Sequence, residues 1–190
     1  MKKLMIAAAI VCAAAMSQAA TVSWNLTNVK EGGEGVSGKM YVIADSNFSR
    51  DAMLALAGEG ATKVSAALSD ATHYAFPWTV TGGTGTLAKG ATGQPTVAQL
   101  GVSEGVAYDF YAVIFDTSDI KDTSNFYVTA LKTGQMMATG TGDKNIYFGT
   151  QATPSAADGA WHAVGAIPEP TSGLLLLLGV AGLALRRRRA

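Results

Sequence analysis

The sequence predicts a mainly β fold, in which one small sandwich-like domain contains one or two short inserted helices. Three observations support this prediction: apolar residues alternate along short segments, glycine-rich turns separate these segments, and only 15% of the 190 residues are charged. Strands at such spacing, without a regular succession of strand and helix, are typical of β-sandwiches. An apolar segment lies near each end of the chain, outside this domain.

The clearest strands differ in how much of each face they are expected to bury. Residues 21–27 place Val22, Trp24 and Leu26 on one face and polar residues on the other, which predicts a half-buried strand. Residues 106–115 are long, aromatic and β-branched, so we expect a central strand that is covered on both faces. Further strands are expected at residues 39–44, 78–81, 125–131, 145–148 and 161–164, with turns or loops at 30–38, 81–86 and 139–143.

The period changes from two to helical spacing after the second expected strand. Phe48, Ala52 and Leu56 recur at this spacing, with Ser46 as the expected N-cap and Gly58 as the expected end. A second helix is expected around residues 64–71. We therefore predict that both helices are inserted into a β-rich domain.

The start of the chain has the pattern of a secretory signal peptide. Two lysines precede an apolar run at residues 4–16, and small residues at Ser17 and Ala19 suit signal peptidase. We predict a signal peptide at residues 1–19, cleaved between Ala19 and Ala20. The single cysteine, Cys12, lies within it, so the mature chain has no disulfide and no cysteine-based metal site.

The segment between the two apolar ends is mildly acidic. Residues 20–167 contain eight basic and thirteen acidic residues, a net charge of −5. Binding to nucleic acid requires a basic surface, so we expect no nucleic-acid partner. We predict one secreted β-rich domain at residues 20–164, long enough to form its own core.

The last 26 residues, 165–190, have three parts in order. Pro168 and Pro170 fix their own φ angles and disfavour helix at the residues before them. An apolar run follows, and we predict a transmembrane helix at about residues 172–185. The chain then ends in four consecutive arginines (Arg186, Arg187, Arg188 and Arg189), which favour a cytoplasmic C-terminus.

This tail resembles the PEP-CTERM sorting domain, on the motif Pro168-Glu169-Pro170, the apolar helix and the basic end. The resemblance is limited to the tail. It implies recognition by an exosortase, with cleavage at or just after the motif, and association with exopolysaccharide or outer-surface material. The implied precursor spans the inner membrane once with its C-terminus in the cytoplasm, and the mature protein is at the cell surface or extracellular.

Residues with possible chemistry do not form a recognisable catalytic set. Ser69, Asp70 and His73 are close in sequence, but no nucleophile motif accompanies them, so we predict that the protein is not an enzyme. A small hydrolase is the third-ranked alternative. We also predict no cofactor and no metal.

The alternative to a metal-free protein is a calcium site in the acidic loop at residues 116–122. Asp116, Asp119 and Asp122 could supply oxygen ligands, although the spacing is not that of an EF-hand, and we favour a solvated loop.

Two functional classes rank above the hydrolase. The first is a structural protein of the cell surface or extracellular matrix. The alternative is a carbohydrate-binding or adhesive module, in which Trp24, Trp78 or Trp161 would stack on sugar rings. Tryptophans in a protein with few aromatic residues are more often part of the core. An exposed row of the three would favour binding.

Overall fold

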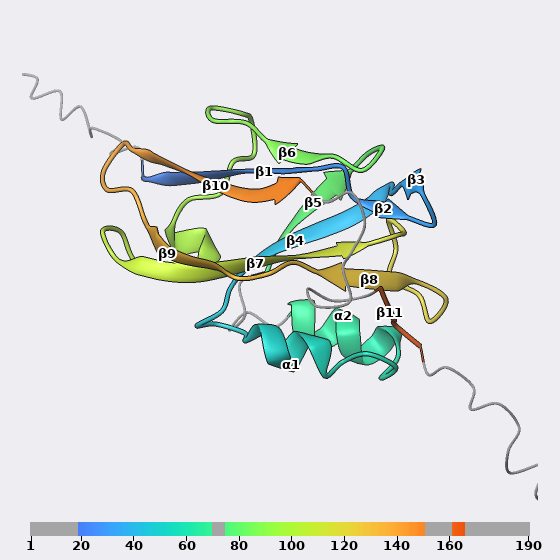
Figure 1. Cartoon of the computed structure of the whole chain (residues 1–190). Coiled ribbons are helices and arrows are strands. Elements are labelled where there is room, and N and C mark those ends of the chain that lie inside the picture. Colours follow the sequence, from blue (N-terminus) through green and yellow to red (C-terminus); the bar gives the residue numbers. More distant parts are fainter. Residues whose placement is uncertain (1–18, 70–74, 151–160, 166–190) are drawn as a thin grey trace, which may run out of the picture.

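The structure, a computed structural model, describes residues 19–69, 75–150 and 161–165. These residues form a mainly β domain with two α-helices, in three layers: a small sheet, a larger sheet and the helices (Figure 1). The predictions of a mainly β fold and of helices after the second long strand are therefore confirmed. In chain order the elements are β1 (Thr21–Thr27), β2 (Lys30–Glu31), β3 (Glu34–Gly35), β4 (Gly38–Ala44), α1 (Arg50–Leu54), α2 (Ala61–Ser69), β5 (Phe76–Val80), β6 (Gly85–Leu87), a 3-10 turn (Ala98–Leu100), β7 (Ala107–Phe115), β8 (Asn125–Val128), β9 (Lys132–Met136), β10 (Asp143–Thr150) and β11 (His162–Ala163).

Strand β7 occupies the centre of the larger sheet, as its sequence predicts. The strand order is β11-β8-β7-β4-β5, and β9 also pairs with β7. The antiparallel register places Ile114 opposite Met40 of β4 and Tyr127 of β8. From Phe110 onward every residue of β7 is buried, because the small sheet covers one of its faces and the helices cover the other.

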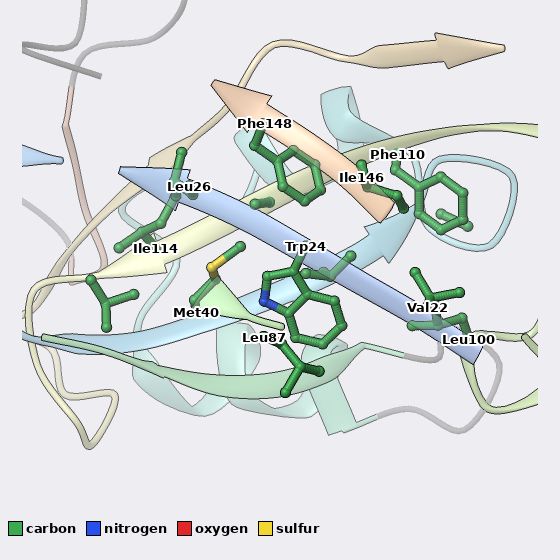
Figure 2. Packing of buried hydrophobic residues seen from close by; sticks show 14 of the residues in the cluster. Val22, Trp24, Leu26, Met40, Leu87, Leu100, Phe110, Ile114, Ile146 and Phe148 are labelled. Atoms are coloured by element: carbon green, nitrogen blue, oxygen red, sulfur yellow. The ribbon is translucent and has the colours of Figure 1, made fainter. Parts of the chain in front are cut away.

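Alternation along β7 and β4 divides the interior into two cores. On β7, Phe110, Ala112 and Ile114 face the small sheet, whereas Tyr111 and Val113 face the helices. Figure 2 shows the first core, where residues of the small sheet meet those of β4 and β7. The members labelled there are Val22, Trp24, Leu26, Met40, Leu87, Leu100, Phe110, Ile114, Ile146 and Phe148.

The small sheet contains a pairing that the sequence did not predict. Its order is β10-β1-β6, with β1 antiparallel to β6 but parallel to β10. Parallel neighbours need a long connection, and here almost the whole domain lies between the two strands. β1 therefore joins the first residues of the domain to a strand near its end.

Several local predictions differ from the structure. Helix α1 begins after Ser49, whose side chain accepts a hydrogen bond from the Ala52 N–H at 3.2 Å, so Ser49 rather than Ser46 is the N-cap. The helix ends at Leu54, before Gly58, which lies in the following turn. The expected loop at 81–86 includes the start of β6, and the predicted strand at 125–131 ends at Val128.

Both predicted targeting segments lie almost wholly outside the described residues. Residues 1–18 and 166–190 are outside them, so the signal peptide and the helix at about 172–185 stay predictions. In the ranges that are described, no helix is long and apolar enough to cross a membrane.

Candidate functional site

The three tryptophans do not form an exposed row. Trp24 is completely buried in the first core, and its ring meets Phe76 and Trp78 edge-on at centroid distances of 5.7 and 6.1 Å. Trp24 therefore cannot stack on a sugar. Its Nε1–H has no hydrogen-bond partner among the described residues, so the packing of the ring must offset an unsatisfied donor.

The other two tryptophans are half-buried and pack against the same core. Trp161 donates its Nε1–H to the Lys30 carbonyl oxygen at 3.1 Å, and its ring lies 5.9 Å from that of Tyr127. Both rings thus contribute to packing, which disfavours the predicted stacking surface.

The acidic loop uses its aspartates to hold neighbouring segments. Asp116 accepts hydrogen bonds from the backbone and side-chain nitrogens of Asn125, at 2.9 and 3.2 Å. Asp122 accepts the Ala61 N–H at 2.7 Å and so caps the first turn of α2. The Asp119 carbonyl oxygen accepts from the Thr117 hydroxyl at 2.8 Å. Among the described residues, no group of three or more His, Cys, Asp or Glu could hold a metal ion.

The Asn125 amide also joins Asp116 to a second acid. Its Nδ2 donates to Glu31 Oε1 at 3.1 Å. Partial burial, and then the nearby charge of Asp116, raise the pKa of Glu31, while the hydrogen bond from Asn125 opposes this rise. Asp116 therefore belongs to a polar contact between β2 and β8 rather than to a shared site with Asp119 and Asp122.

The residues of the predicted hydrolase alternative are only partly described. Ser69 is the exposed last residue of α2, whereas Asp70 and His73 lie outside the described residues. The other histidine, His162, packs on Phe126 at a ring distance of 5.4 Å. Burial, and then the charge of Arg50, lower the pKa of His162, which keeps the ring neutral at neutral pH.

The outer side of the small sheet is a polar surface that the sequence analysis missed. Because Trp24, Leu26, Ile146 and Phe148 point into the first core, the residues between them point away from it. We call this surface the polar face; it consists of Thr21, Asn25, Thr86, Asp143, Asn145 and Tyr147, together with Ser23, which lies on the same side of β1 but is fully buried.

Strand register gives the polar face its order. Ser23 pairs with Asn145, and Asn25 lies between Tyr147 on β10 and Thr86 on β6. Tyr147 is 55% exposed, although it lies in the middle of a strand. The alternation of Ile146, Tyr147 and Phe148 was the signal that could have identified it.

Hydrogen bonds hold the polar groups of this face in place. Asn145 Nδ2 donates to the Ser23 hydroxyl at 3.0 Å, and that hydroxyl donates to Asp143 Oδ2 at 2.8 Å. The other oxygen of Asp143 accepts from the Thr21 hydroxyl at 3.0 Å and from the Gln94 amide. The Thr86 hydroxyl donates to Asn25 Oδ1 at 3.3 Å.

A hollow of about 310 Å³ adjoins the polar face at the start of β1. Thr21 and Asp143 belong to both the hollow and the face. The remaining lining comes from Ala19, Lys89, Gly90, Ala91, Gly93, Gln94 and Thr141. The small sheet thus presents a polar hollow at one end and an exposed aromatic ring further along.

The predicted signal-peptidase site lies at the first two residues that the structure describes. Ala19 is exposed, whereas Ala20 is fully buried. The Ala20 carbonyl oxygen accepts the Val97 N–H at 2.8 Å, and the Ala20 nitrogen lies 3.4 Å from Glu104 Oε1. The other oxygen of Glu104 accepts the Gly140 N–H at 2.8 Å. Cleavage after Ala19 would place an ammonium group directly beside this carboxylate.

A chain that begins at Ala20 is therefore expected to be more stable than the same chain with Ala19 and Gln18 retained. The free ammonium gains a charge-assisted hydrogen bond to Glu104, which we expect to add about 1 kcal/mol to the free energy of unfolding. Urea unfolding of the two chains measures the difference. Glu104→Gln should abolish it, and equal stability of the chains that retain Glu104 would contradict the pairing.

Comparison with known proteins identifies the tail of the chain. The described residues define a mainly β domain, followed by a segment for which sequence analysis predicts sorting. Residues 166–189 match the model of the PEP-CTERM protein-sorting motif, so the predicted resemblance is confirmed. The motif implies export and cell-surface sorting by an exosortase. No curated protein and no solved structure matches the chain significantly.

Proposed function

We propose that this protein is a non-catalytic structural component of the cell surface or the extracellular matrix. The sorting motif at residues 166–189 is the observation that supports the proposal most directly. It is joined to a domain in which strand β7 is buried from both sides, and such an interior suits a rigid extracellular building block. In this proposal the signal peptide starts export, and signal peptidase and the exosortase are the processing partners.

The proposed precursor crosses the inner membrane once before it is released to the surface. The apolar residues 172–185 would span the membrane, and Arg186 to Arg189 would remain in the cytoplasm. The structural role itself would involve exopolysaccharide around the cell. Neither a metal nor another cofactor has a part in this proposal.

The proposal can be tested in the producing cells by comparing the intact chain with one that lacks residues 166–190. The intact chain should be found in the surface or matrix fraction, and the shortened chain should be lost from it. A strain without the protein should form a less cohesive matrix, which the intact chain restores. Ser69→Ala and His73→Ala should restore it equally well; failure of these variants despite normal sorting would favour the hydrolase alternative.

The second candidate is a carbohydrate-binding or adhesive module. The buried position of Trp24 argues against a sugar-binding surface formed by the three tryptophans. The polar face supports a different version, because it combines fixed hydroxyl and amide groups with one exposed ring.

A further inference from the structure

We infer that the polar face and the adjoining hollow together form a binding site for a neutral polysaccharide chain, with Tyr147 as its stacking platform. This inference develops the second candidate function and rests on it. The site lies on strands β10, β1 and β6, on the side of the small sheet away from the larger sheet (Figure 1).

The first step of the argument is the position of Tyr147. Its neighbours Ile146 and Phe148 are buried in the first core, so the backbone at Tyr147 is held on both sides. The tyrosine itself is 55% exposed. An aromatic ring supported by a sheet loses little conformational freedom when a ligand stacks on it. The C–H face of a pyranose ring is apolar enough to stack on such a ring, whereas its hydroxyl groups need polar partners.

The second step is the set of polar groups around this ring. Asn25 lies opposite Tyr147, Thr86 lies one strand further, opposite Asn25, and Asn145 is two residues before Tyr147 on the same side of β10. Amides and hydroxyls both donate and accept hydrogen bonds, which is the chemistry that sugar hydroxyls require. The bond from Asn145 to Ser23 orients the amide before a ligand arrives.

The third step is the charge of the surface. Around Tyr147 the members of the polar face are neutral, and Asp143 at the far end has both oxygens occupied by hydroxyl or amide donors. The polar face therefore offers no cation to a nucleic acid or to a polyuronate, and the hollow combines one cation, Lys89, with the acidic Asp143, so it adds no net positive charge. Charge complementarity therefore favours a neutral glycan over an acidic one.

The fourth step is the length of the site. Thr21 borders the hollow, and Asn25 lies opposite Tyr147, four residues further along β1. At the rise of an extended strand, these positions are about 13 Å apart. A glycan of several sugar units could place one unit in the hollow of about 310 Å³ and another on Tyr147. Ala19 lines the hollow, so cleavage after this residue would open the site further.

The test is an array of neutral hexose and N-acetylhexosamine chains, with polyuronate chains beside them, probed with the full chain purified in detergent. We expect retention on at least one neutral chain, and stronger retention as that chain lengthens. Tyr147→Ala should weaken retention roughly tenfold through loss of stacking, while Tyr147→Phe should keep it because the ring remains.

Met136→Ala is the matched control, because Met136 is also 55% exposed and in a strand but lies on β9, which belongs to the larger sheet. It should leave retention unchanged. Absence of retention on every neutral chain, equal retention by Tyr147→Ala, or equal weakening by Met136→Ala would each overturn the inference. The structural proposal is tested by surface sorting and matrix cohesion and not by glycan retention. Failure of the glycan inference therefore does not decide the structural proposal.

Discussion

Replacing Ile114 with aspartate is expected to unfold the domain. Ile114 is fully buried near the C-terminal end of β7, between Met40 on β4 and Tyr127 on β8. An aspartate at this position would place a carboxylate in the first core, among apolar side chains (Figure 2). The cost of burying an unpaired charge is several kcal/mol, which is comparable to the whole stability of about 5–15 kcal/mol of a typical domain.

Thermal unfolding followed by circular dichroism measures this effect. Thr79→Asp is the control, since Thr79 is exposed on β5 of the same sheet and lies opposite Lys39. There the new carboxylate remains in water beside a cation, so we expect a change of at most about 1 kcal/mol. A melting temperature close to that of the unchanged protein for Ile114→Asp would show that β7 does not form the centre of the core.

The strands that follow from the sequence are those whose burial leaves a pattern. Residues 21–27 alternate because only the inner face of β1 packs on the first core. Residues 110–115 are aromatic or aliphatic in succession because this part of β7 is covered from two sides. In both cases the pattern of apolar side chains along the strand indicates which of its faces are covered by neighbouring elements.

Other features depend on pairing with other segments of the chain, which a local sequence pattern does not show. Strand β9 has the sequence Lys-Thr-Gly-Gln-Met and is mostly exposed, so only its pairing with β7 makes it a strand. The parallel pairing of β1 with β10 joins segments more than a hundred residues apart, which no local period reveals. The N-cap of α1 is Ser49 and not the predicted Ser46. The Asp45 carboxylate accepts the Arg50 N–H at 2.7 Å and holds the turn that precedes the helix.

The candidate site, too, could not be predicted from local sequence patterns alone. Trp24 and Tyr147 both lie on strands of the small sheet, one on the buried side and the other on the exposed side. Residue type alone favours tryptophan as the sugar-stacking group, but alternation decides which side chain faces solvent. The sorting tail could be identified without structure, because its motif, apolar run and basic end are consecutive in the sequence.

The mature protein from its native host is expected to lack the C-terminal arginines. The sorting motif at residues 166–189 implies processing by an exosortase, and we place the cut at or just after Pro168-Glu169-Pro170. Prolines at 168 and 170 favour an extended chain, which is the form that the active site of a protease or transpeptidase accepts. Glu169 between them offers one negative charge to a basic group of the enzyme.

The length of the apolar run also favours removal of the tail. Its thirteen residues, 173–185, would extend only roughly 20 Å as a helix, against a hydrocarbon thickness of about 30 Å. Such a run can hold a precursor for a short time by thinning the bilayer, but it is a poor permanent anchor. Intact-mass measurement should therefore find a chain that ends before Arg186, and a Pro168→Ala, Pro170→Ala double variant should retain the tail. A native mass that still includes Arg186 to Arg189 would instead show that the tail is kept as an anchor.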